Sequence, residues 1–112
     1  MAKVFSSSVQ MTSVTPNNIT FTARQVTVGT VAVQLANIPI PDGTTLVLKS
    51  YAGNGNNRRI WIADSAVNVA AAATRIELRP GESVGVSVQN ANSVFVLASA
   101  AGVILELLVE QD

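Results

Sequence analysis

Apolar and polar residues alternate along much of this chain, and this two-residue period restricts its fold more than any other feature. Every second residue is Val or Leu in the segments 26–28, 31–35 and 83–88. Successive side chains of a β-strand point to opposite faces of a sheet, so the period predicts strands that place one face on a core. The same period, together with the many Val and Thr residues, argues against a helical bundle.

Turn signals divide the chain between these segments. They are the Pro- and Gly-containing segment 39–43, the Gly- and Asn-rich run 53–57 and the Arg-Pro-Gly-Glu sequence at 79–82. Gly readily adopts positive φ, and Pro suits the first central position of a turn. The spacing predicts about seven or eight short strands, and therefore a small antiparallel β-sandwich or barrel. A parallel α/β fold would need more helical segments than the chain offers.

Two pairs of segments predict β-hairpins. Segments 44–52 and 58–64 flank the run 53–57, and segments 94–98 and 103–109 flank an Ala-Ala-Gly turn at 100–102. Two strand-like segments joined by a short turn that contains Gly are expected to pair with each other.

Residues 65–83 do not follow the two-residue period. Four consecutive Ala residues favour a helix, but this segment has no charged face. We expect an irregular crossing with at most one helical turn, followed by a short strand at 76–78. The apolar stretch 93–110 is not expected to span a membrane, because Ser99, Gly102 and Glu106 interrupt the roughly 20 apolar residues that a span requires.

The first 22 residues differ in composition from the rest, being rich in Ser, Thr and Asn. One interpretation is a floppy terminus. The other is an arm that becomes ordered only against a neighbouring molecule, because Phe5, Ile19 and Phe21 are anchors that disordered tails seldom carry. We divide the chain into an N-terminal arm, 1–22, and a β-sandwich domain, 23–112. No run of signal-peptide length is apolar here, so no secretion signal is expected.

Composition excludes several classes of function. Seven basic residues balance seven acidic ones, and charged residues make up only 12% of the chain. A neutral chain lacks the field that attracts nucleic acid or an anionic membrane, so neither is an expected partner. The absence of Cys and His removes thiol and imidazole chemistry. The carboxylates are spread singly, so we expect no enzyme, no catalytic residues, no metal site and no cofactor.

Several predicted strands are apolar on both faces, whereas a sandwich needs only one apolar face. Trp61 opposes Ile60 and Ile62, for example, and Phe95 opposes Val94 and Val96. Either the arm and the Ala-rich crossing cover the second faces, or another subunit does, in which case the chain is a homo-oligomer.

The candidate interface residues are aromatic or basic, the types enriched where proteins meet. Tyr51, Arg58, Arg59 and Trp61 form one basic and aromatic group, whose alternatives are a plain structural role and a ligand site that stacks a base or a sugar. The full set is Phe5, Phe21, Tyr51, Arg58, Arg59, Trp61 and Phe95.

Three segments carry a resemblance to a known group of proteins. They are Y-x-G-N-G-x-x-R-x-I-W-I-A-D-S at 51–65, L-R-P-G-E-S-V-x-V at 78–86 and N-S-V-F-V-L-A-S-A-A-G at 92–102. The segment VTVGTVAVQLANIPIPDGTTLVLKS at 26–50 precedes them. In this order and spacing the chain resembles small structural proteins of tailed bacteriophages over about residues 26–109. It departs from their pattern at Trp61, where the group often has Tyr, and at Ala63-Asp64, where it often has Gly and a small residue.

The resemblance implies a virion component with a β-sandwich or jelly-roll-like domain and no catalytic residues. Its favoured reading is a capsid decoration, or cement, protein on the phage head, made in the host bacterial cytoplasm. The implied partners are the major capsid protein or other virion proteins, and the implied oligomer is a homotrimer. The alternative is a tail, baseplate or fibre module that binds a host glycan or another tail protein.

Overall fold

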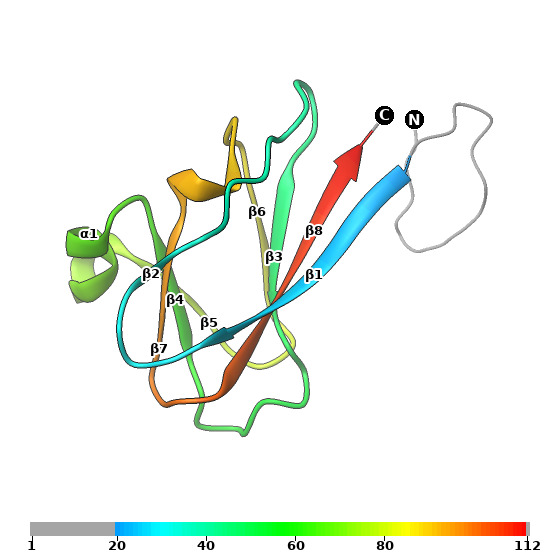
Figure 1. The fold of residues 1–112 in the computed structure, drawn as a ribbon. Helices are drawn as coiled ribbons and strands as arrows, with labels where there is room; N and C mark the ends of the chain where they lie inside the picture. The colour runs from blue at the N-terminus through cyan, green and yellow to red at the C-terminus, as the bar shows by residue number, and fades with distance from the viewer. Residues whose placement is uncertain (1–19, 112) are drawn as a thin grey trace.

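The computed structural model describes residues 20–111, and the side chains of residues 23–109 within them (Figure 1). Two four-stranded sheets make up this part of the chain. Sheet A has the strand order β1-β8-β3-β6, and sheet B has the order β2-β7-β4-β5. Every strand pairing in them is antiparallel. The strands are β1 (Thr20–Val28), β2 (Val33–Gln34), β3 (Leu46–Ser50), β4 (Ile60–Ala63), β5 (Ile76–Leu78), β6 (Ser83–Val86), β7 (Phe95–Ala98) and β8 (Val103–Gln111).

Consecutive strands alternate between the two sheets, except that β4 and β5 share sheet B. Eight antiparallel strands in two sheets, connected so that each sheet interleaves early and late strands, form a jelly roll. The structure therefore confirms the expected all-β fold, a small antiparallel β-sandwich of jelly-roll type. β1 begins at Thr20 and so includes the last three residues of the predicted arm, 1–22; the rest of that arm lies outside the described residues.

Both predicted hairpins are wrong. β3 and β4 lie in different sheets, and so do β7 and β8, so neither turn joins paired neighbours. β8 pairs instead with β1 and β3, and β7 pairs with β2 and β4. The turn before β8 contains Gly102 at φ 75°, which only turns the chain from one sheet to the other. A two-residue period identifies a strand and its faces but not its partner, which is why the error arose.

The predicted Ala-rich crossing and its short strand are confirmed, but the crossing has two short helical turns where at most one was expected. One helical turn, α1 (Ala66–Ala70), is followed by the 3-10 turn η1 (Ala72–Thr74) and by β5. The hydroxyl of Ser65 caps α1 by accepting a hydrogen bond from the backbone N–H of Asn68 at 3.0 Å. The predicted turn at 79–82 also forms, with a 2.9 Å bond from the N–H of Glu82 to the carbonyl of Arg79.

The core lies between the sheets and consists of the alternate residues that the period assigned to one face. Leu46 and Leu48 of β3 and Ile60 of β4 are fully buried, as are Val96 of β7 and Leu105 of β8. The segment 31–35 departs from its prediction, because only β2 forms there and Val33 remains 39% exposed. β2 is the edge strand of sheet B, so little of the chain lies beside it. Within residues 20–111 no helix is long and apolar enough to cross a membrane, and residues 93–110 contribute β7 and β8 instead.

An asparagine side chain joins the loop after β3 to the start of β8. Nδ2 of Asn54 donates to the carbonyl of Ile104 at 2.9 Å, and Oδ1 accepts from the N–H of the same residue at 3.0 Å. Nδ2 also lies 3.1 Å from the hydroxyl of Ser50, which is completely buried. Asn54 therefore acts as an extra rung between β3 and β8.

We predict that Asn54→Ala lowers the free energy of unfolding by about 1–3 kcal/mol, because it leaves the partly buried N–H of Ile104 without a partner, whereas the carbonyl of Ile104 keeps the N–H of Tyr51 at 3.1 Å. The matched control is Asn57→Ala, an exposed residue of the same loop, for which we expect a change within about 0.5 kcal/mol. Urea unfolding followed by the fluorescence of the single Trp measures both. Equal effects of the two substitutions would contradict the role assigned to Asn54.

Candidate interaction surfaces

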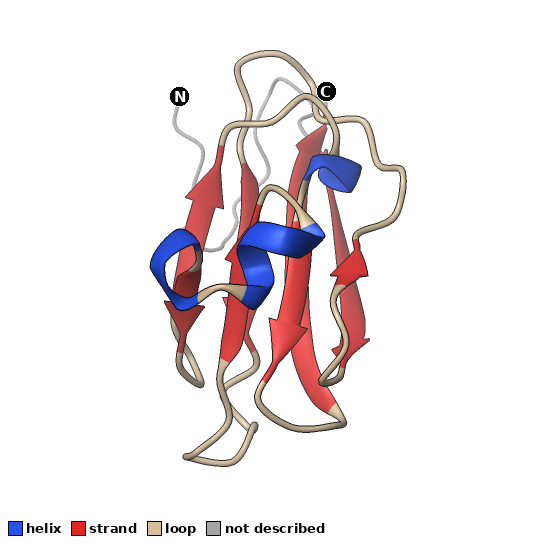
Figure 2. Ribbon diagram, turned by 90° about the vertical axis from the view of Figure 1, so that its left-hand side faces the viewer, coloured by secondary structure: helices blue, strands red, loops and turns tan. Residues whose placement is uncertain are grey.

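The outer face of sheet B is covered by the chain's own Ala-rich crossing. α1 packs against β4 and β7, and Figure 2 shows it in front of the strands. Val69 of α1 is completely buried yet does not belong to the core cluster between the sheets, so its burial comes from the other side of sheet B. Beneath the crossing, Trp61, Phe95 and Leu97 point outward and are half-buried.

A ring of charged side chains surrounds Trp61. Its Nε1 donates to Oε1 of Glu77 at 3.1 Å, and the guanidinium of Arg75 lies 3.9 Å from the centre of its ring. Oε2 of Glu77 also pairs with Arg59 at 3.4 Å and with Arg79 at 3.6 Å. Nη1 of Arg75 donates to the carbonyl of Val69, which ties α1 to the same cluster. These contacts occupy one ring face and the indole N–H of Trp61.

The predicted basic and aromatic group does not assemble as one site. Arg59 and Trp61 share Glu77 on the outer side of sheet B. Tyr51 follows β3 of sheet A, is 40% exposed and lies over Gly53, where any Cβ would clash with its ring. Arg58 is exposed in the loop between β3 and β4. Tyr51 and Trp61 therefore do not face a common ligand.

Two further predicted residues lie where the structure says little of them. Phe5 is outside the described residues. Phe21 is described only through its backbone, which pairs with Glu110 in the β1–β8 ladder. Phe95, in contrast, lies half-buried on sheet B as described above.

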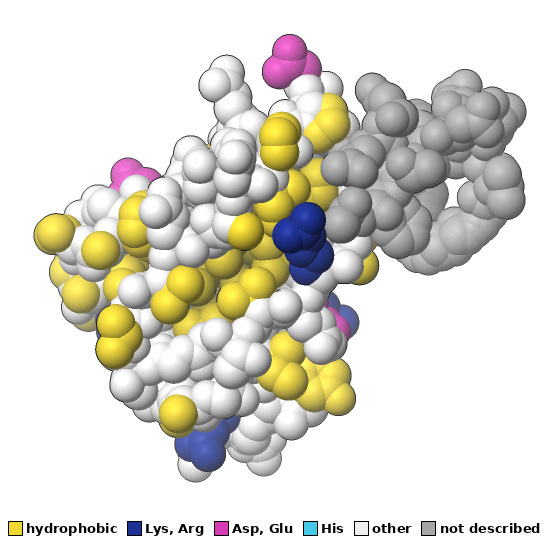
Figure 3. Space-filling model, viewed as in Figure 1, with side chains coloured by type: hydrophobic (Ala, Val, Ile, Leu, Met, Phe, Trp, Pro, Cys, Tyr) yellow, Lys and Arg dark blue, Asp and Glu magenta, His cyan; other side chains and the backbone are white. Residues whose placement is uncertain are grey.

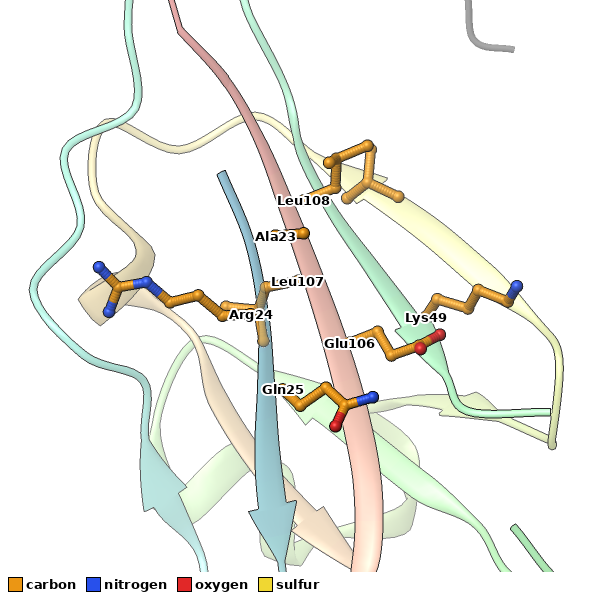
Figure 4. Close-up of a pocket in the computed structure, with 8 residues that line it drawn as sticks. Ala23, Arg24, Gln25, Lys49, Glu106, Leu107 and Leu108 are labelled. Atoms are coloured by element: carbon orange, nitrogen blue, oxygen red, sulfur yellow. The ribbon is translucent and has the colours of Figure 1, made fainter. Parts of the chain in front are cut away.

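The outer face of sheet A carries an open hollow of about 380 Å³. The side chains that point into the hollow come from the three adjacent strands β1, β8 and β3 (Figure 4). Arg24 also belongs to the lining, but its side chain points to the other side of β1. The outward lining residues are Ala23 and Gln25 of β1, Val47 and Lys49 of β3, and Glu106 and Leu108 of β8.

Strand register arranges these six residues in two parallel rows. Leu108 lies opposite Ala23 on one side and Val47 on the other, which makes an apolar row across the sheet. Glu106 lies opposite Gln25 and Lys49, which makes a polar row beside it. Directly opposed side chains in antiparallel strands are close enough to interact, so each row forms a continuous surface. Such a surface offers apolar area and an adjacent charge pattern, the combination that a protein partner can use.

The apolar outer faces of the two sheets therefore differ in whether the chain itself covers them. The Ala-rich crossing covers sheet B, as one of the two interpretations expected. For sheet A, the described part of the chain leaves the hollow open to solvent. No three His, Cys, Asp or Glu side chains gather as a metal site anywhere between residues 20 and 111.

Sequence reasoning missed Glu77 and Arg75, which contact Trp61, and Val69, whose carbonyl accepts a hydrogen bond from Arg75. Glu77 is directly opposite Trp61 in the ladder between β4 and β5, but it is sixteen residues away in the chain. The sequence could have indicated the contact between Glu77 and Trp61 only if the pairing of β4 with β5 had been predicted correctly.

No family model matches this chain, and no curated protein matches it. One solved structure, described as "Bacillus endospore appendages form a novel family of disulfide-linked pili", is similar at 20% identity. The similarity covers 82% of each chain with a TM-score of 0.49. So distant a likeness implies nothing about what this chain binds. This chain has no Cys, so no disulfide can link its own copies.

We predict that Arg75→Ala exposes Trp61 and increases acrylamide quenching of its fluorescence, because the guanidinium covers one face of the indole ring. Loss of the cation–π contact should lower the free energy of unfolding by about 0.5–1 kcal/mol. Arg79→Ala is the control, since Arg79 also pairs with Glu77 but has a side chain that is 62% exposed. Equal quenching in the two variants would contradict the stacked arrangement.

Proposed function

We propose that this chain is a structural virion protein, and that it acts as a capsid decoration protein on the head of a tailed bacteriophage. The single observation that supports it is the open hollow on sheet A, where an apolar row and a polar row lie side by side. The resemblance over residues 26–109 points to the virion, and the head surface is its favoured location. A jelly roll by itself supports many functions, so the proposal depends on this surface rather than on the fold.

Docking through this surface would need neither a catalytic or covalent step nor a strong long-range electrostatic field. Burying apolar area is favourable by about 25 cal/mol per Å², and the polar row then sets the orientation of the partner. A chain of net charge zero approaches a second copy or a shell without long-range repulsion. On a repeating lattice, several modest contacts of this kind add up to firm attachment. The proposed partners are the major capsid protein and further copies of this chain, with a trimer favoured.

The alternative site within the virion is the neck, tail or baseplate, where the same surface would bind another tail protein. A glycan-binding fibre module finds less support, because Trp61 already has Arg75 on its ring and Glu77 on its N–H. Tyr51 follows β3 of the other sheet, so the two aromatic side chains do not flank one sugar.

We predict that Leu108→Glu weakens binding to phage particles, and self-association where it occurs, at least about tenfold, because it places a charge in the middle of the apolar row. Val67→Glu is the control: Val67 belongs to α1 on the opposite outer face and is 78% exposed, so binding should not change. Co-sedimentation with particles and sedimentation velocity of the purified chain give the two measurements. Thermal unfolding of both variants separates a lost surface from a lost fold.

A purified chain that stays monomeric and ignores particles with or without Leu108→Glu would reject the proposed function. Binding that is lost with Val67→Glu and kept with Leu108→Glu would instead indicate a docking surface on the side of sheet B. The position of the chain in an electron-microscopy map of the particle then distinguishes the head from the tail.

A further inference from the structure

The loop between β3 and β4 contains the one place in the chain where an asparagine directly precedes a glycine, Asn54-Gly55. The side-chain amide of an asparagine lies within reach of the backbone nitrogen of the next residue, which attacks it slowly. A glycine has no Cβ to crowd that nitrogen, so the attack is least hindered in an Asn-Gly pair. Asn54 is therefore the asparagine whose sequence context most favours modification by its own backbone.

The loop does not require a glycine at position 55. The glycines with positive φ in the described part of the chain are Gly43, Gly81 and Gly102, and Gly55 is not among them. A Cβ at position 55 would meet Cγ of Arg58 at 3.5 Å, which is an ordinary van der Waals contact. An alanine fits there, so the reactive pair can be removed without changing the loop.

Water, which completes the reaction, reaches this loop. Gly55 is exposed and Asn54 is half-buried. Figure 1 places the loop between β3 and β4 at the lower end of the molecule, and Figure 3 shows that end in the same view. The surface there consists mostly of polar side chains and backbone beside a group of Lys or Arg side chains. The described part of the chain therefore leaves the pair open to solvent.

The folded chain holds the Asn54 side chain in an arrangement that opposes the reaction. Oδ1 accepts from the N–H of Ile104 at 3.0 Å, and Nδ2 donates to the carbonyl of Ile104 at 2.9 Å and to the hydroxyl of Ser50 at 3.1 Å. We call these three hydrogen bonds the Asn54 clamp. Attack at Cγ turns the planar amide into a tetrahedral centre, which cannot keep both bonds to one backbone residue. The clamp must therefore open first, and the rate follows the population of the opened form.

We propose that Asn54 is a deamidation site whose modification is restrained by the Asn54 clamp. The backbone nitrogen of Gly55 gives up its proton and bonds to Cγ of Asn54. The bond from Cγ to Nδ2 breaks, and ammonia leaves with that proton. Water then adds to the five-membered imide and opens it on one side or the other, which gives aspartate at position 54 or its isoaspartyl isomer. No electrons are transferred, and water is the only co-reactant.

The product cannot rebuild the clamp. One carboxylate oxygen still accepts from the N–H of Ile104, but the other takes the place of Nδ2 and faces the carbonyl of Ile104 with no proton to donate. Two acceptors in that position repel each other, and the isoaspartyl isomer also adds a methylene to the backbone. Deamidation therefore loosens the junction of β3 and β8 irreversibly. The inference is independent of the proposed function, because it concerns only the chemistry of this loop.

The first experiment compares deamidation of the folded and the unfolded chain. The unaltered protein is incubated in one buffer with and without guanidinium chloride, and peptide mapping by mass spectrometry follows the exchange of an amide nitrogen for oxygen at position 54. We expect conversion at least about tenfold faster in the unfolded chain, where the clamp is absent. Equal rates would overturn the restraint, and no conversion in the unfolded chain would overturn the site.

The matched variant is Gly55→Ala, which fits the loop and keeps the clamp. We expect conversion at position 54 in guanidinium chloride to slow at least about tenfold, because the added Cβ crowds the attacking nitrogen. An unchanged rate would overturn the imide route. Asn57, which precedes Arg58 in the same loop, is the internal reference and should convert more slowly than Asn54 in the unaltered chain.

The second experiment measures the consequence with a variant that equals the product. We expect Asn54→Asp to lower the urea midpoint of unfolding by at least about 0.5 M, because it sets an acceptor against the carbonyl of Ile104. Asn57→Asp adds the same charge at an exposed position of the loop and should leave the midpoint unchanged. Equal midpoints for the two variants would overturn the proposed loosening of β3 and β8.

Discussion

The contact between the inner faces of the two sheets is the interaction on which the rest of this structure depends. β8 lies at its centre, between β1 and β3, and its four inward side chains from Val103 to Val109 are at most 3% exposed. The chain has no disulfide, and the ion pairs described here are at least partly exposed, so they contribute little. Apolar burial between the sheets is therefore the dominant favourable term. The positions of α1, the loops and the outward rows all follow from which face of each strand this core takes.

The inner faces of both sheets are buried, but their outer faces differ: one is covered by the chain and the other carries an open hollow. Sheet B receives the crossing between β4 and β5, in which α1 packs against β4 and β7 and Val69 is completely buried. Sheet A has no such crossing in its described part, because the connections from its strands run to sheet B rather than over its own outer face. Leu108 and Val47 consequently line an open hollow. Of the two outer faces, that of sheet A is therefore the one whose apolar side chains are open to a partner.

Sequence patterns located the strands well but gave no information on which strands pair. The alternation at 83–88 gave the inward side of Val84 and Val86 correctly, and the crossing with its short strand at 76–78 was also correct. Both hairpins failed, because a turn between two sheets uses the same Gly-rich residues as a turn within one. The prediction of the basic and aromatic group was wrong for the same reason. Tyr51 and Trp61 are close in sequence, but Tyr51 follows β3 of sheet A whereas Trp61 lies in β4 of sheet B. Glu77 and the two rows of sheet A depend on register, which no local pattern contains.

The register of β1, β8 and β3 decides which side chains form the outer surface of sheet A. Asparagine side chains that fix this register therefore also fix the proposed docking surface. Oδ1 of Asn90 accepts hydrogen bonds from the N–H groups of Ile38 and Asn92, just as Asn54 bonds both backbone groups of Ile104. A slip of one residue between β3 and β8 would carry Leu108 to the inner side and Leu107 to the outer side. Asn54 opposes this slip at the point where β8 begins. The Asn-rich loop after β3 thus has a structural role, because Asn54 holds the register of the strands that carry the apolar and polar rows.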